Sequence, residues 1–185
     1  MGKVTEKNFD SVTKKVTIDQ LETRESPDDG VTEHYLNGLL FNGRSESFWP
    51  GGSKSSEGYF SKGRQARLWS SWYSNGQKWT EGNYKDGKVD GLFTLWYENG
   101  QKRLEVNYKY DKLDGLGTYW YKNGQKELEG NYKDGNFMSA VVWKPNGEKC
   151  PESNVKDGEG VVVYYNWDGT EDYFMNYKDG EPVED

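Results

Sequence analysis

The chain has 185 residues, a formal net charge of −7 and a mean hydropathy of −1.09. An acidic chain lacks the clustered Lys and Arg that displace counterions from phosphate, so we expect no nucleic-acid partner. Anionic lipids repel an acidic protein, which disfavours membrane binding. Aromatic residues make up 16% of the sequence. Disordered chains are poor in aromatic residues, and we therefore expect one folded domain or one uninterrupted array.

Residues 1–18 are polar and show no periodicity, which predicts a polar N-terminal arm. This segment lacks the apolar core of a signal peptide, and no run in the chain approaches the ~20 apolar residues of a membrane span. We therefore expect a soluble protein. Its compartment would be the cytoplasm, or the envelope or periplasm if an export signal has been removed.

From residue 19 the sequence repeats itself. A glycine marks each of the units, at Gly30, Gly52, Gly76, Gly100, Gly124, Gly147 and Gly169. From Gly76 to Gly169 the intervals are 24, 24, 23 and 22 residues. A fixed period of this size is typical of stacked repeats, each of which buries its apolar surface against its neighbours. We expect one array over 19–185, with a degenerate first repeat over 19–43, regular repeats over 44–138, and divergent C-terminal repeats or a cap over 139–185.

Two kinds of turn punctuate each unit. Asn75-Gly76, Asn99-Gly100 and Asn123-Gly124 are strong signals for two-residue hairpin turns, because both residues tolerate positive φ. Asp86-Gly87 and Asp134-Gly135 supply the second kind. The segments between turns are rich in Trp, Tyr, Val and Thr, as strands are. The predicted fold class is all-β: an elongated, twisted array of antiparallel β-hairpins that forms a single-layer curled sheet.

Aromatic residues recur at two positions of the unit. One stands four residues before each first turn and the other eight residues after it, and a small residue such as Gly82 leaves room for a neighbouring ring two positions before the second. We interpret both columns as a buried aromatic spine. The predicted spine residues are Phe48, Trp72, Trp96, Trp120, Trp143, Tyr84, Tyr108 and Tyr132.

A second aromatic row directly follows the first column, and by the alternation of a strand it should point to the opposite face. Its members are Trp49, Tyr73, Tyr97 and Tyr121. Exposed aromatic residues on a rigid scaffold are typical of protein interfaces, so we predict that this row binds a protein. We interpret the neighbouring Lys and Glu columns as a solvated face of alternating sign, and Glu81, Glu105 and Glu129 could steer a basic partner toward it.

The segment from Glu81 to Gly91, followed by Leu92-Phe93-Thr94-Leu95-Trp96-Tyr97-Glu98-Asn99-Gly100-Gln101, resembles the MORN (membrane occupation and recognition nexus) repeat. It is most similar to a bacterial variant with the pattern Trp-Tyr-x-Asn-Gly, and the resemblance covers about residues 44–185. Proteins with this variant are often described as antitoxin-like or immunity-like, and others resemble surface or envelope lipoproteins. The resemblance therefore implies a binding protein.

Few residues of the chain are of a type and spacing that would indicate a catalytic or metal-binding site. His34 lies in the degenerate first unit, where a packing or surface role is expected, and Cys150 has no histidine at motif distance. One His and one Cys make a poor zinc site. The recurrent Asp residues do not have the spacing of a calcium-binding loop, and they stand where turns need them. We expect no catalytic, metal or cofactor site, and hence no enzyme.

The leading functional prediction is a non-catalytic, protein-binding repeat scaffold. By resemblance it would be antitoxin-like or immunity-like and would neutralise a partner, such as a basic toxin domain, by covering its surface. The alternative is a structural or adhesive protein of the cell envelope or surface, which could self-associate through the ends of its sheet.

Overall fold

The computed structural model describes residues 16–183, and it confirms an all-β fold. Within these residues the only helical segment is the short 3-10 helix η1 at Ile18–Gln20. The strands before the regular repeats are β1 (Val16–Thr17), β2 (Glu22–Glu25), β3 (Thr32–Leu36), β4 (Leu39–Leu40) and β5 (Gly43–Phe48). The central strands are β6 (Lys54–Ser61), β7 (Arg64–Trp72), β8 (Lys78–Lys85), β9 (Lys88–Trp96), β10 (Lys102–Lys109), β11 (Lys112–Trp120), β12 (Lys126–Lys133) and β13 (Asn136–Val142). The last strands are β14 (Gly160–Tyr165), β15 (Glu171–Lys178) and β16 (Glu181–Val183).

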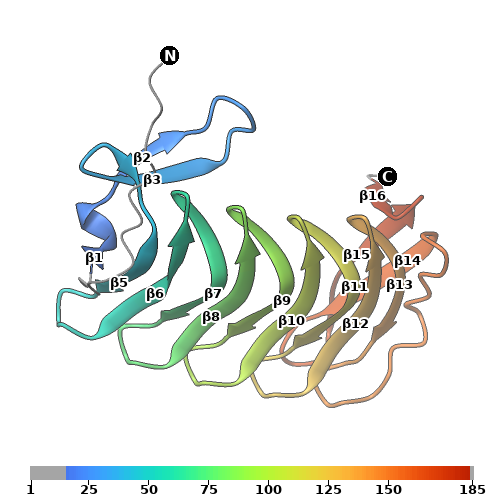
Figure 1. Ribbon diagram of the computed structural model, residues 1–185. Coiled ribbons are helices and arrows are strands. Elements are labelled where there is room, and N and C mark those ends of the chain that lie inside the picture. Colours follow the sequence, from blue (N-terminus) through green and yellow to red (C-terminus); the bar gives the residue numbers. More distant parts are fainter. Residues whose placement is uncertain (1–15, 184–185) are drawn as a thin grey trace.

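The strands form one long open sheet with a small sheet at each end (Figure 1). Strands β5 to β13 pair antiparallel in sequence order, and β1 adds to β5 in parallel. Strands β2–β4 form a three-stranded sheet at the N-terminal end, and β14–β16 form another at the C-terminal end. The predicted array of antiparallel hairpins is therefore confirmed, and its long sheet does not close on itself.

The predicted N-terminal arm lies mostly outside the described residues, which begin at Val16. Its last residues form β1 beside β5, and the Ser45 hydroxyl donates a hydrogen bond to the Val16 carbonyl at 3.1 Å. η1 follows directly, and the Gln20 side chain accepts a hydrogen bond from the Thr17 N–H.

The two kinds of turn have different geometry. At Asp86-Gly87 both residues have positive φ (52° and 84°) and Lys85 pairs with Lys88, as in a two-residue type I′ hairpin. At Asn75-Gly76 only the glycine has positive φ, and the Gly76 N–H donates to the Tyr73 carbonyl. This is a three-residue turn that ends in a glycine bulge, so the expectation of a two-residue turn at the Asn-Gly sites was wrong. Asn75 uses its carboxamide oxygen to accept from the Gln77 N–H instead.

The strands bend strongly along their length (Figure 1). The register shifts between Gly82 and Tyr84 on β8, where β9 carries extra residues that include Gly91 at φ +115°. Gly115 on β11 has a φ of +102° at the equivalent place, while Arg67 on β7 adopts a φ of +63° there. Bulges kink a strand and raise its twist, so one bulge per hairpin curls the whole sheet.

One face of the sheet, here called the inner face, packs aromatic rings over glycines. Trp69 lies edge-on to Phe60 (ring centroids 4.9 Å apart), and the Tyr119 and Tyr132 hydroxyls are 3.0 Å apart. A Cβ added to Gly82 would stand 2.5 Å from the ring of Phe93, so the ring occupies the place of the missing side chain. Buried clusters therefore form at both ends of this face, around Phe60 and around Phe137.

The structure divides the predicted spine between the two faces. Tyr84, Tyr108 and Tyr132 lie on the inner face, where Tyr84 packs near Trp69 and Tyr108 near Phe93. Trp72, Trp96, Trp120 and Trp143 lie half-buried on the opposite, outer face. Phe48 is 48% exposed and is not part of a buried column. The reason is a bulge after each first turn, where two residues of β8 oppose Trp72, and this breaks the period-two count.

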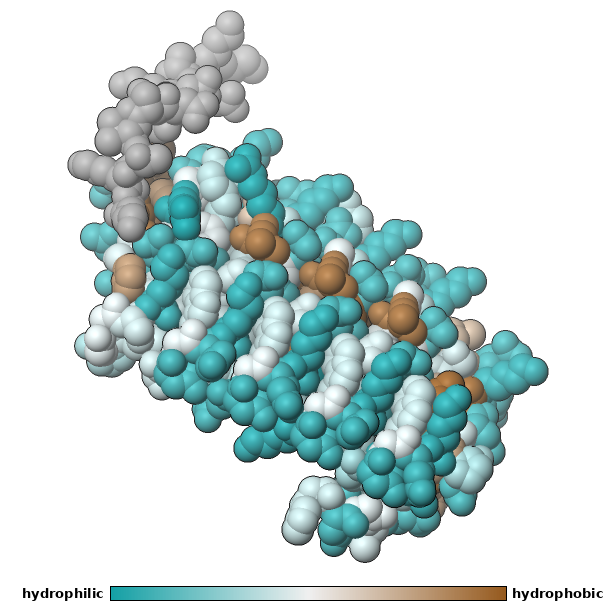
Figure 2. All heavy atoms as spheres, turned by 90° about the horizontal axis from the view of Figure 1, so that it is seen from below, coloured by the Kyte–Doolittle hydropathy of each residue, from teal (hydrophilic) through white to brown (hydrophobic). Residues whose placement is uncertain are grey.

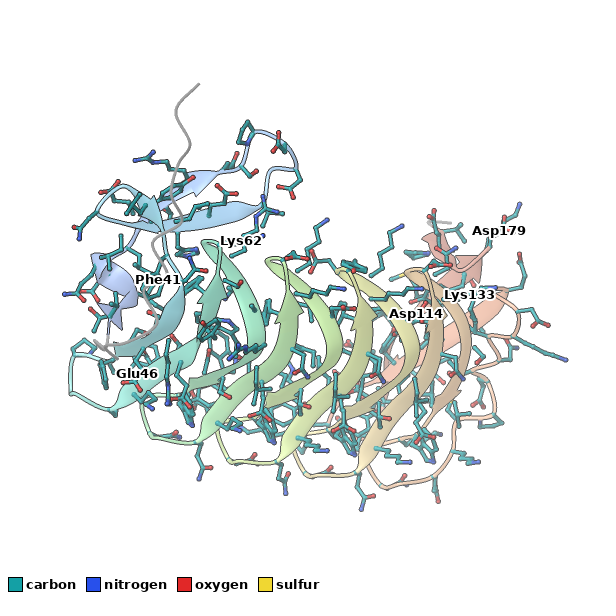
Figure 3. The ribbon with its side chains drawn as sticks, viewed as in Figure 1. Phe41, Glu46, Lys62, Asp114, Lys133 and Asp179 are labelled. Carbon is teal, nitrogen blue, oxygen red and sulfur yellow. The ribbon has the colours of Figure 1, made fainter. Side chains whose placement is uncertain are left out.

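Hydrogen bonds and ion pairs fix the small end sheets. Arg64 bonds Asp29 and Glu33 of the N-terminal sheet, at 2.6 and 2.9 Å, and the His34 N–H donates to the Gly63 carbonyl. At the other end the Phe137 N–H donates to the Gly180 carbonyl. Figure 3 shows Lys62, Asp114, Lys133 and Asp179 along the edge that the second turns form. The two small sheets are attached to the long sheet along this edge.

Candidate functional site

The outer face carries a repeated set of three side chains. Lys78 lies over the Trp96 ring, 5.5 Å from its centroid, and forms an ion pair with Glu81. The same set of one Lys, one Glu and the Trp of the next unit, here called a rung, recurs along the face. The rungs are Lys54–Glu57–Trp72, Lys78–Glu81–Trp96, Lys102–Glu105–Trp120 and Lys126–Glu129–Trp143.

Each rung is stabilised by contacts of modest strength. A surface ion pair contributes about 0–1 kcal/mol, and an exposed cation–π contact about 0.5–1 kcal/mol. Burial raises the pKa of Glu81, but the hydrogen bonds from Lys78 and Ser70 outweigh it and lower the pKa overall. The pKa of Glu57 is lowered by the Lys54 ammonium first, against the effect of burial, and then by Arg44. The charges of this face are therefore largely compensated within the chain.

An exposed apolar row runs beside the rungs, and sequence analysis did not identify it. Leu68, Leu92 and Leu116 occupy the same place in three successive units, and Val141 continues the row two residues further along its strand, opposite Glu129 as Thr118 is. The exposed fractions of these four side chains lie between 40% and 50%. Figure 2 shows apolar side chains at regular intervals on this side of the molecule, separated by polar stripes. Equivalent residues are two strand spacings apart, about 10 Å. The signal was present in the sequence as a Leu at the same place in three successive units.

The predicted binding row of Tyr residues has a role within the chain. The hydroxyls of Tyr73, Tyr97 and Tyr121 donate to the carbonyls of Trp96, Trp120 and Trp143, each in the next unit, at 2.8, 2.8 and 2.9 Å. Trp49 Nε1 donates to the Trp72 carbonyl in the same way. Burial raises the pKa of all three tyrosines. These hydrogen bonds connect successive units, and no contact with a partner is needed to explain them.

The remaining predicted binding residues, Glu81, Glu105 and Glu129, lie on the outer face and pair with the lysines of their own rungs. Thr94 and Thr118 alternate with them on the intervening strands. The structure therefore brings the glutamates together with the apolar row, and it places the Tyr row apart, at the first turns.

The single His and Cys are both packed into the structure. The His34 ring packs against Phe60 at a tilt of 40°, with centroids 4.3 Å apart, and burial lowers the pKa of His34. The buried Cys150 thiol accepts a hydrogen bond from the Tyr165 hydroxyl at 2.9 Å. Over residues 16–183, no group of three or more His, Cys, Asp or Glu side chains is placed to hold a metal ion. No helix in this part of the chain is long and apolar enough to span a bilayer.

No curated protein is similar enough to the chain to count as a match. A family described as the MORN repeat variant matches residues 68–86, 89–110 and 113–134. Each segment covers two successive strands and the first turn between them, from β7 and β8 to β11 and β12, and the segments end at the second turns. Three consecutive units of the array therefore match the MORN repeat variant, and MORN repeats are typically non-catalytic and generally serve in binding or as a scaffold.

Proposed function

We propose that the protein is a non-catalytic scaffold of the antitoxin or immunity type, which neutralises a partner protein by covering part of its surface. The observation that carries this proposal is the exposed apolar row on the outer face, in which Leu68, Leu92 and Leu116 recur at one place of the unit and Val141 extends the row. A stack of repeats has no need to expose a large apolar side chain at the same place in three successive units. Exposed apolar side chains surrounded by polar ones can serve as the anchors of a protein interface.

The charge of the chain supports a basic partner, such as a basic toxin domain. The net charge is −7, so long-range attraction would speed the approach of a cationic protein and weaken with salt. Glu81, Glu105 and Glu129 stand beside the apolar row and provide carboxylates at the place of contact. The rings of Trp49, Tyr73, Tyr97 and Tyr121 remain proposed anchors, in addition to the hydrogen bonds that they make within the chain.

The test is capture of a partner from the native organism, followed by binding kinetics with purified proteins. Leu92→Ser combined with Leu116→Ser should raise the dissociation rate at least tenfold, whereas Leu39→Ser, exposed but in the N-terminal sheet, should not. Raising the salt concentration should slow association. An unchanged dissociation rate in the double variant, or an acidic partner, would contradict the proposal.

A matched pair of variants distinguishes a contact between the Tyr97 ring and the partner from the hydrogen bond that Tyr97 makes within the chain. Tyr97→Phe removes the hydroxyl that donates to Trp120 but keeps the ring, and Tyr97→Ala removes both. If the ring contacts the partner, only the Ala variant dissociates faster once both are shown to be folded.

A structural or adhesive role is the second candidate. It is favoured by the edge strand β16, whose residues are exposed and which pairs on one side only. Concentration-dependent self-association, with no captured partner, would replace the first proposal by this one.

A further inference from the structure

The outer face changes its chemistry at the C-terminal end. In the backbone register of the last complete rung, Lys126 and Glu129 on β12 stand opposite Trp120 and Thr118 on β11. The C-terminal sheet repeats this register, with Glu171 opposite Tyr165 and Phe174 opposite Val163. Glu171 therefore takes the place of the rung lysine, and Phe174 takes the place of the rung glutamate. The charge at this position is reversed relative to the four rungs before it.

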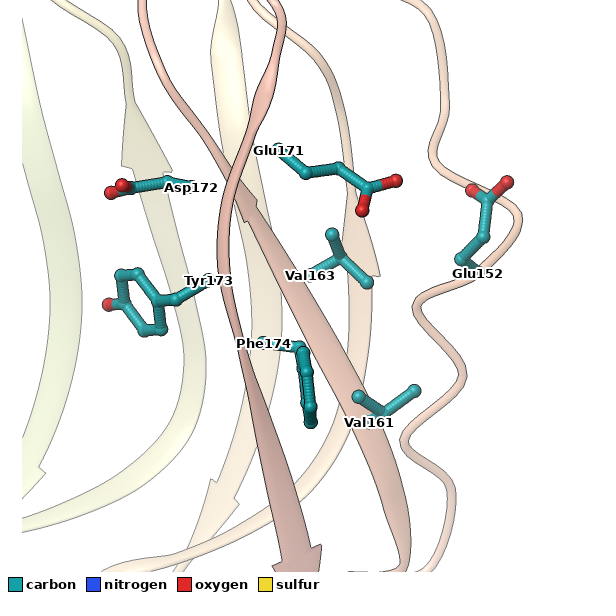
Figure 4. Close-up of a pocket in the computed structure, with 7 residues that line it drawn as sticks. All are labelled: Glu152, Val161, Val163, Glu171, Asp172, Tyr173 and Phe174. Carbon is teal, nitrogen blue, oxygen red and sulfur yellow. The ribbon is translucent and has the colours of Figure 1, made fainter.

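The same residues line a depression of about 440 Å³, here called the C-terminal pocket. Val161 and the nearly buried Val163 form its floor, and Phe174, which is 59% exposed, forms a wall. Glu171 reaches across Val163 toward the loop that carries Glu152, whereas Asp172 and Tyr173 point to the other side of β15 (Figure 4). None of the lining residues is basic.

The two lysines near the pocket make cation–π contacts with aromatic rings. Lys149 lies over Trp143, 5.8 Å from its centroid, and Lys144 lies over Tyr165 at 5.2 Å. A backbone N–H and the Cys150 thiol lower the pKa of Glu152, with a further contribution from Lys144, so this carboxylate is ionised at neutral pH. The pocket thus combines an apolar floor with two carboxylates and lacks the ammonium group that each earlier rung supplies.

We propose that the C-terminal pocket binds a Lys or Arg side chain from a basic segment of a partner protein. The aliphatic stem would lie on Val161, Val163 and Phe174, and the cation would lie between Glu152 and Glu171. Long basic side chains commonly bury the stem on apolar surface while the charged group stays hydrated. The inference rests on the proposed function, because it assumes a protein partner, and it adds the chemistry of one contact.

The first test uses small probes on the full chain. N-acetyl-arginine methylamide should shift the methyl resonances of Val161 and Val163 in a saturable way. Its citrulline analogue has a similar shape without the charge and should bind at least tenfold more weakly. Glu171→Gln should weaken the arginine probe at least fivefold, while Glu98→Gln, which removes an exposed carboxylate outside the pocket, should leave its affinity unchanged. Glu171 is exposed, so the variant should retain the fold.

Equal binding of the arginine and citrulline probes, or unchanged affinity in Glu171→Gln, would overturn the proposal. A second test separates it from the proposed function. If a captured partner binds Glu171→Lys as tightly as the wild type, the pocket is not a contact, although the scaffold function stands. If the arginine probe binds as expected but the chain captures no protein, the pocket stands and the scaffold function falls.

Discussion

Two aromatic residues that are adjacent in the sequence of one unit make different contacts and therefore stabilise different parts of the array. Trp96 lies on the outer face under Lys78, while the next residue, Tyr97, donates its hydroxyl to the carbonyl of Trp120. The first contact joins side chains on the surface of the sheet. The second joins the backbone of one unit to the next, and it recurs at Tyr73 and Tyr121. Tyr is suited to this place because its ring packs and its hydroxyl finds a partner.

Tyr97→Phe should lower the free energy of unfolding by about 1 kcal/mol, because the Trp120 carbonyl loses its donor while the ring is kept. Urea denaturation measures the change. Tyr173→Phe is the matched control: its ring stacks on Tyr164 and is half exposed, and we expect a change within about 0.5 kcal/mol. Equal losses in the two variants would show that the bond between units contributes nothing.

Glycine at the inner face is required by packing at one position in particular. A Cβ on Gly58 would lie 2.0 Å from the Trp69 ring, which is buried and held by a hydrogen bond from its Nε1 to the Tyr59 carbonyl. Gly58→Ala should therefore destabilise the fold by about 1–3 kcal/mol, the usual cost of overpacking. Gly51→Ala meets nothing within 4 Å and should change stability by less than about 0.5 kcal/mol. Comparable thermal stability of the two variants would contradict this account.

At the scale of elements, the positions of the turns and the period were predictable, but the geometry of the first turns and the assignment of side chains to the two faces were not. Gly and Asn or Asp recur at fixed places, which indicated hairpins and an all-β array. The bulge at Lys78 has no distinctive residue pair, and the bulge at Gly91 falls on an Asp-Gly pair within a strand, where such a pair does not form a turn. Each bulge changes which side chains share a face. For this reason Trp96 was assigned to the same spine as Tyr84, and the exposed row that includes Leu92 was not identified.

The C-terminal sheet is attached through a close backbone approach. Gly180 has a φ of +80°, and a Cβ there would lie 2.7 Å from the Asn136 Cβ and 3.1 Å from the Phe137 nitrogen. Gly169 has a similar φ of +85° with nothing within 4 Å. In both Ala variants the left-handed backbone conformation should lower the free energy of unfolding by about 1 kcal/mol. Gly180→Ala should lose at least about 1 kcal/mol more in urea denaturation, because β16 must also move away from β13. Equal losses would show that this approach can relax freely.

The N-terminal sheet is attached by charged groups, so its attachment should depend on pH. Hydrogen bonding to Arg64 lowers the pKa of Asp29 below 3.8, and bonds from Tyr35 and then Arg64 lower the pKa of Glu33 below 4.5. Groups with lowered pKa stabilise the folded state above their unfolded pKa, and the contribution is lost as the pH falls through the folded pKa.

The wild type should therefore be more stable than Arg64→Met at pH 7, and the difference should shrink below about pH 4 as both carboxylates become protonated. Thermal unfolding at pH 7, 5 and 3 measures it. His34 is present in both proteins, so its own titration cancels in the comparison. A difference that does not vary with pH would mean that Arg64 acts through packing alone.

At the scale of the whole molecule, the regular repeats form a linear stack in which each unit bonds to the next one. The hydroxyl of Tyr97 and the carboxamide of Asn99 both reach the next unit, and neither reaches further. In such a stack, stability is approximately the sum of the units and of the interfaces between them. The outer face consequently lengthens by one rung for each unit without any change in its local geometry.

Removal of one whole unit should therefore be tolerated. Deleting residues 101–124 removes β10 and β11 and joins Gly100 to Gln125, so that Tyr97 can donate to the Trp143 carbonyl in place of Trp120. We expect a folded, less stable array with the same far-ultraviolet circular dichroism per residue. Deleting only 101–111 removes β10 and one turn, and it leaves β9 and β11 running in the same direction with no connection long enough for parallel pairing. This smaller deletion should abolish cooperative unfolding, and the idea of independent units would fail if it were the better tolerated of the two.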